Sequence, residues 1–265
     1  MTQGEVSDRS SVRVFAVLVV GGLVGVIAIV PYTLTVLAAV ESSADEPPPP
    51  LWILLPLQIT QGLVLVAAAT ALGLWLGPRV GLGAPLLRDL VRAVPGARVR
   101  LRALLVPSAL FGVVVAGAIV LLDLWVFTPR LATPTNPIAT VQPPAWQGLL
   151  AAIYGGVAEE LMLRLGVMTF LVWLGARLTR TTEPGASVMW PAIVLTALLF
   201  GIGHLPLTAA IWPLTPLVIA RALLLNGIGG LVFGWLYWKR GLLAAMLAHF
   251  TADIVVHVVI ASMNH

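Results

Sequence analysis

The chain has 265 residues, of which 59% are hydrophobic and only 10% charged, and its formal net charge is +4. Soluble globular domains carry about a quarter charged residues, so this composition excludes that class and predicts a protein of the lipid bilayer. The basic residues lie between apolar segments, where membrane topology explains them, and we expect no nucleic-acid partner. Cysteine is absent, which excludes disulfides and cysteine-ligated metals.

Seven apolar segments are long enough to cross a bilayer, which takes about 20 helical residues. In chain order they are 14–40, 51–77, 103–127, 146–175, 188–205, 214–238 and 241–262. The first is too long for the apolar part of a signal peptide and is interpreted as a span. The sequence therefore predicts an all-α polytopic membrane bundle of about seven helices. A short re-entrant helix within 205–216 would raise the count to eight.

We divide the chain into an N-terminal part with three spans, residues 1–145, and a C-terminal part with four, residues 146–265. Arginines orient the bundle, because 78–102 holds six of them whereas 41–50 holds only the acids Glu41, Asp45 and Glu46. The positive-inside rule places 78–102 and the N-terminus in the cytoplasm, and the C-terminus outside. We expect a multi-pass protein of the bacterial inner membrane.

Six charged residues fall inside the predicted spans: Asp123, Glu159, Glu160, Arg164, Arg221 and Asp253. A charge at mid-bilayer costs about 2.5–3.5 kcal/mol, so these side chains must face the bundle interior with partners. Glu160 and Arg164 are four residues apart and can pair along one helix face. Glu159 is turned by about 100° from Glu160 and is left for another role. Asp123 and Arg221 lie in the outer halves of their spans and are expected to form a structural pair.

Histidines add to these buried groups. The motif FGIGH (200–204) ends in His204, and HFTAD (249–253) places His249 and Asp253 four residues apart on another helix. His257 continues that stripe and is interpreted as an interhelical hydrogen-bonding residue, and the terminal His265 as an exposed one. Two interpretations of the acids and imidazoles stay open: static contacts between helices, or a site for proton transfer or metal binding.

Three motifs in order carry a resemblance to a known family. EELMLR fits E-E-x-x-x-R, FGIGH fits F-x-x-x-H, and HFTAD fits H-x-x-x-[N/D]. Over about residues 146–257 the chain resembles the CPBP intramembrane proteases, also called the ABI family, which include the CAAX prenyl endopeptidases. The resemblance implies a peptidase with a peptide or membrane-protein substrate, working within the lipid bilayer.

The resemblance also implies roles for individual residues. Glu159 would be the general base that activates a water molecule together with His204. Glu160 and Arg164 would orient and support the site. His249, with the residue at position 253, would stabilise the oxyanion that forms at the scissile carbonyl.

Position 253 departs from the best-characterised members, which carry asparagine there. An ionised aspartate has no hydrogen to donate to an oxyanion, so Asp253 would stay protonated, orient His249 or bind a metal. Glu159, His204, His249 and Asp253 are all residue types that bind zinc, and a divalent metal such as zinc is therefore an alternative cofactor. The chain has no HExxH motif.

Two further functions use the same residues. The protein could be a non-catalytic peptide-binding or immunity protein built on this scaffold. It could also be a proton-coupled transporter in which the buried acids and histidines relay protons, although no internal repeat supports this alternative.

Overall fold

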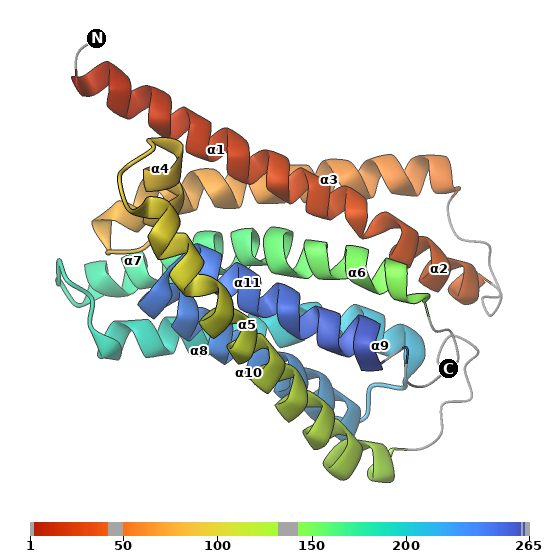
Figure 1. The fold of residues 1–265 in the computed structure, drawn as a ribbon. Helices are drawn as coiled ribbons and strands as arrows, with labels where there is room; N and C mark the ends of the chain where they lie inside the picture. Colours follow the sequence, from red (N-terminus) through yellow and green to blue (C-terminus); the bar gives the residue numbers. More distant parts are fainter. Residues whose placement is uncertain (1–2, 42–49, 132–142, 261, 263–265) are drawn as a thin grey trace.

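The computed structural model describes residues 3–41, 50–131, 143–260 and 262, and these residues form a helical bundle without any β-strand among them (Figure 1). The acids Asp45 and Glu46 and the terminal His265 lie outside the described residues. The helices are α1 (Gln3–Ala28), α2 (Val30–Glu41), α3 (Leu51–Leu76), α4 (Pro85–Val91), α5 (Ala97–Leu122), α6 (Ala145–Ile153), α7 (Thr169–Leu178), α8 (Ala186–Gly203), α9 (Leu205–Ile211), α10 (Pro216–Arg240) and α11 (Leu242–Ile254).

Within the described residues, seven helical stretches are long and apolar enough to cross a membrane. They are Ser10–Ala38, Leu51–Arg79, Ala97–Arg130, Ala145–Leu178, Ala186–Ile211, Pro216–Arg240 and Leu242–Val259. The predicted all-α polytopic bundle and its seven spans are confirmed. The alternative of eight helices does not add a span, because α9 follows α8 directly and the two form one candidate span, Ala186–Ile211.

Glycine and proline set the ends of several helices. Gly96 precedes α5 with φ of 79°, and Gly241 separates α10 from α11 with φ of 88°, a backbone region that side chains with a Cβ avoid. At the start of α10, the Thr215 hydroxyl accepts a hydrogen bond from the Val218 backbone N–H at 3.3 Å. Pro216 fills the next position, where a helix tolerates its missing N–H.

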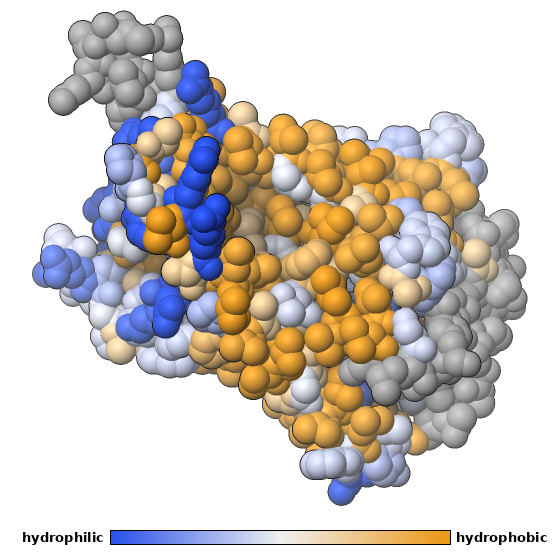
Figure 2. Space-filling model, viewed as in Figure 1, coloured by the Kyte–Doolittle hydropathy of each residue, from blue (hydrophilic) through white to orange (hydrophobic). Residues whose placement is uncertain are grey.

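The surface of the bundle is apolar around its middle, as a lipid-facing surface must be. Large side chains such as Val106, Val114 and Leu110 are more than half exposed. Figure 2 shows a hydrophobic band across the middle of one face and hydrophilic residues gathered at the end where α4 lies. The structure is therefore that of an integral, multi-pass membrane protein. Which side of the membrane each end faces stays a prediction from the arginines.

The stretch Ala145–Leu178 is the centre of the bundle. Its middle part packs against α1, α3, α8, α10 and α11, and its last part contacts α3 and α8. Helices from both predicted parts of the chain, divided at 145/146, thus surround it. Two segments of this stretch, Tyr154–Glu159 and Leu161–Met168, are π-helical rather than α-helical. Such turns are rare and frequently occur at functional sites.

Candidate active site

The Glu160–Arg164 pair lies at the centre of the bundle. Both side chains are fully buried, and Arg164 Nε lies 3.4 Å from Glu160 Oε2. Arg164 Nη2 donates to the Gly230 backbone carbonyl at 3.4 Å. Two aromatic rings flank the guanidinium, with their centroids 5.4 Å (Phe200) and 5.9 Å (Phe233) from its Cζ atom. The predicted pair is thus present, and it forms inside the protein, where a charge needs a partner.

Glu160 also holds His249, a contact between residues 89 positions apart in the chain. The Nδ1 atom of His249 lies 2.9 Å from Glu160 Oε1, and because a carboxylate only accepts, Nδ1–H is the donor. The imidazole stacks on Phe233, with centroids 4.5 Å apart and planes 20° apart. One hydrogen bond and one stacking contact therefore fix the orientation of the buried ring.

The other ring nitrogen of His249 faces two more carboxylates. Its Nε2 atom lies 3.7 Å from Glu159 Oε2 and 3.6 Å from Asp253 Oδ2. Both separations are longer than a normal hydrogen bond. At such distances, two polar groups can be bridged by a water molecule. The side chains of Glu159 and Asp253 are 18% and 21% exposed, so this side of the ring is the more open one.

Gly155 makes room for this arrangement. A Cβ atom added at Gly155 would collide with Asp253 Oδ2 and would lie 3.2 Å from His249 Nε2. The next residue, Gly156, allows the same helix to approach the backbone of α11 near Phe250. The pair of glycines therefore brings the helix that carries the glutamates against the helix that carries His249 and Asp253.

His204 lies at the junction of α8 and α9. Its Nδ1 atom is 2.8 Å from the Phe200 backbone carbonyl, which only accepts, so Nδ1–H is the donor, and in the neutral ring Nε2 carries the lone pair. The Phe200 ring contacts both imidazoles, with centroids 4.7 Å from His204 and 5.5 Å from His249. Among the described residues, His204 forms no ion pair with a carboxylate, and its predicted role in activating water together with Glu159 stays a prediction.

Glu159, His249 and Asp253 of the predicted metal set lie close together, but they are not arranged as a metal site. Within 3–41, 50–131, 143–260 and 262, no three histidine, cysteine or acid side chains are arranged so that they could hold one metal ion. His204, the fourth residue of the set, forms no ion pair with any of the three carboxylates around His249. The arrangement instead suits acid–base chemistry and hydrogen bonding by the side chains themselves.

Other polar residues of the spans lie outside this cluster. Arg221 and Asp123 form the predicted pair, with Nε–Oδ1 at 2.6 Å and Nη2–Oδ2 at 2.7 Å. His257 makes an edge contact with the Tyr32 ring, whose centroid is 6.2 Å away. Asn226 donates to the Ala222 carbonyl of its own helix at 2.8 Å. These contacts are between protein groups and support structural roles.

Sequence reasoning missed two contributors to the site. Phe233, on which His249 stacks, belongs to an apolar helix whose pattern does not distinguish it from other core residues. Gly155 was visible as part of a Gly–Gly pair four residues before the first glutamate. That pair signals close helix contact, although the sequence does not say with which helix.

The fold and the site together define the class: a multi-pass membrane protein with a buried cluster of acids and histidine between its helices. Residues 141–255 match the model of a protein family described as type II CAAX prenyl endopeptidase Rce1-like. Over these residues the chain is similar to that family, which confirms the resemblance carried by the three motifs. The match supports a function of the intramembrane CAAX protease type. No curated protein and no solved structure matched the chain.

Proposed function

We propose that the protein is an intramembrane endopeptidase in which Glu159 activates a water molecule for attack on a peptide bond. The observation that carries this proposal is the unequal environment of two adjacent glutamates around one histidine. Glu160 is fully buried, and its two oxygens face His249 Nδ1 and Arg164. Glu159 is partly exposed and lies 3.7 Å from His249 Nε2. It is the carboxylate of the pair that remains available to a water molecule.

The reaction follows from general acid–base chemistry. Glu159 takes a proton from water, and the oxygen of that water forms a bond to the scissile carbonyl carbon. The carbonyl oxygen becomes an oxyanion. The C–N bond then breaks, and the proton held by Glu159 passes to the leaving nitrogen, which gives a carboxylic acid and an amine. Water is consumed once and the carboxylate is restored.

His249 is the proposed oxyanion donor. A ring that carries protons on both nitrogens keeps Nδ1–H on Glu160 and presents Nε2–H to the space beside Glu159 and Asp253. A donor held in place before the reaction stabilises the developing charge more than a mobile one. Asp253 is then a positioning residue for His249, because its carboxylate accepts and does not donate.

His204 completes the proposed machinery. Its Nδ1–H is engaged by the Phe200 carbonyl, so Nε2 is the acceptor that can hold a hydrogen of the attacking water beside Glu159. The proposal uses no metal, because no three histidine or acid side chains in the part of the chain that the structure describes are arranged to hold one. Its substrates are peptides or membrane-protein segments. The family description makes a prenylated C-terminal peptide the first to test.

The test measures hydrolysis by the full-length protein purified in detergent. Quenched fluorescent peptides, with and without a farnesyl group, are incubated in H₂¹⁸O, and the products are analysed by mass spectrometry. We expect one ¹⁸O atom in each new carboxyl terminus, and a loss of at least about 100-fold in Glu159→Gln and His204→Ala. Asp123→Asn is the control, because it removes a carboxylate outside the site.

Three results would overturn the proposal. They are cleavage by Glu159→Gln at the wild-type rate, products without ¹⁸O, or no cleavage of any peptide by folded wild-type protein. If none is cleaved while a peptide still binds, the non-catalytic binding function takes its place. Proton flux through liposomes that depends on Glu159 would favour the transporter.

A further inference from the structure

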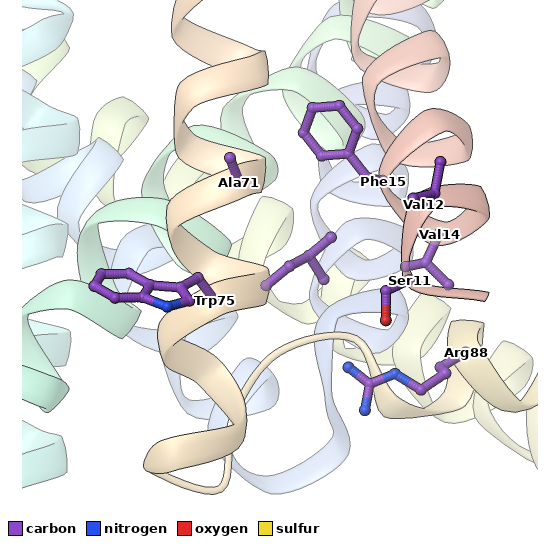
Figure 3. Close-up of a pocket in the computed structure, with 8 residues that line it drawn as sticks. Ser11, Val12, Val14, Phe15, Ala71, Trp75 and Arg88 are labelled. Carbon is purple, nitrogen blue, oxygen red and sulfur yellow. The ribbon is translucent and has the colours of Figure 1, made fainter. Parts of the chain in front are cut away.

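A second site, independent of the proposed peptidase, lies between α1, α3 and α4 at the end of the bundle that holds α4 (Figures 1 and 3). It is a pocket of about 300 Å³. Its walls are mostly apolar, and Figure 3 shows the Arg88 side chain reaching from α4 towards the space between α1 and α3. The residues that matter to its chemistry are Val12, Val14, Phe15, Leu74, Trp75 and Arg88.

The pocket lies where apolar helices give way to polar surface. The first candidate span begins at Ser10 and the second ends at Arg79, so Val12 and Trp75 occupy corresponding ends of antiparallel helices. Figure 2 shows hydrophilic residues at this end, next to the apolar band. A molecule bound here would have one part in the hydrocarbon region and another among the charged groups.

Arg88 gives the pocket a cationic group with at least one hydrogen-bond donor that no described residue accepts from. Its Nε atom is buried and has no hydrogen-bond partner among the described residues. A guanidinium is always charged, and a buried donor left without an acceptor destabilises the structure. An anion in the pocket would supply the missing acceptor.

Among the described side chains, no carboxylate forms an ion pair with Arg88. The acid next to it in sequence, Asp89, forms an ion pair with Arg100 at 2.8 Å. Arg79 lies over the Trp75 ring, with Cζ 4.8 Å from its centroid, and adds a second cation beside the pocket. Arg92 donates from Nε and Nη2 to the Ser10 hydroxyl at 2.9 and 2.7 Å, and thus fixes α4 against α1. The described charges around the pocket are mainly positive.

We propose that this pocket binds an anionic phospholipid. The headgroup phosphate accepts hydrogen bonds from Arg88, and an acyl chain lies along Val14, Phe15 and Leu74. Guanidinium groups match phosphate oxygens in geometry as well as charge. Basic clusters at the ends of spans attract anionic headgroups by about 1 kcal/mol per cation, which corresponds to about a fivefold change in affinity. The apolar wall and the arginine together fit a lipid better than a free anion.

The experiment is native mass spectrometry of the delipidated, full-length protein in detergent, titrated with phosphatidylglycerol, phosphatidylcholine or inorganic phosphate. We expect phosphatidylglycerol to bind at least about fivefold more tightly than phosphatidylcholine. Arg88→Gln should remove this preference. Arg98→Gln, which removes an equal charge from the same basic segment but does not line the pocket, should retain it. Millimolar phosphate should not displace the lipid.

A substitution that fills the pocket provides a second, independent test. Ala71 lines the pocket and is exposed, so Ala71→Phe should occupy it while leaving Arg88 in place, and should weaken the first binding step of both lipids. Gel filtration and thermal unfolding establish that each variant is folded. Equal binding of the two lipids by wild type, an unchanged preference in Arg88→Gln, or an equal loss in Arg98→Gln would overturn the proposal. Full displacement by phosphate would show a free-anion site instead and would also overturn it.

Discussion

Gly155→Ala is the most direct test of the close contact between the glutamate helix and α11. The added Cβ would overlap Asp253 Oδ2 and lie 3.2 Å from His249 Nε2, which is shorter than the ordinary 3.4–4 Å contact. Asp253 and the imidazole must therefore move away from Gly155. Because Glu160 and Phe233 hold the far side of the ring, the shift changes its orientation rather than moving it freely.

The size of the effect follows from these contacts. Overpacking in a tight interior costs about 1–3 kcal/mol of stability. A displacement of about 1 Å in a catalytic group can lower the rate about 100-fold. An alanine within a helix otherwise gains about 0.5–1 kcal/mol over glycine, which offsets part of the stability cost. We therefore expect a loss of peptide cleavage of about 100-fold with a moderate loss of stability.

The assay compares the cleavage rate and the thermal unfolding midpoint of Gly155→Ala and Gly117→Ala. Gly117, on α5, has no atom within 4 Å of an added Cβ, so its replacement should leave cleavage unchanged and stability equal or higher. A fully active Gly155→Ala variant would show that Asp253 and His249 do not need their present positions, and would refute the proposed geometry.

Three other predictions follow from the same contacts. Arg164→Met leaves Glu160 buried without its cation, and should lower the free energy of unfolding by about 3–5 kcal/mol, measured by denaturant titration in detergent, with partial recovery when Glu160→Gln is added. Asp253→Asn should keep cleavage within about tenfold of wild type, whereas Asp253→Ala should lose more, because only the former still contacts His249. Treatment with EDTA followed by metal add-back should leave the cleavage rate unchanged, and a rate restored only by zinc would contradict the metal-free proposal.

The bundle was predictable from the sequence because hydropathy alone decides which segments enter a bilayer. The predicted span 14–40 corresponds to Ser10–Ala38, and 241–262 to Leu242–Val259. Local spacing also predicted the pairing of Glu160 with Arg164, because residues four apart face each other along a helix. These features depend on short-range periodicity, which a single sequence carries.

The contacts between distant helices were less accessible. The bond from Glu160 to His249 joins residues 89 positions apart, and periodicity does not specify which glutamate faces the imidazole. The π-helical turns also change the register of the glutamates, and the sequence gives no rule that predicts them. The predicted metal set assumed that His204 would join the acids, but among the described residues His204 forms no ion pair with a carboxylate, and no three such side chains are arranged to hold one metal ion.

The cost of burial explains why adjacent glutamates can differ in role. A fully buried carboxylate is tolerated only when its oxygens have partners, and Glu160 has an arginine and a histidine. Those partners also keep it from accepting a proton from water. Glu159 has fewer partners and retains contact with the open side of His249. A truncation of Glu160 therefore removes stability and catalysis together, whereas Glu159→Gln can remove catalysis alone, and the two effects separate only when unfolding and cleavage are measured on the same variant.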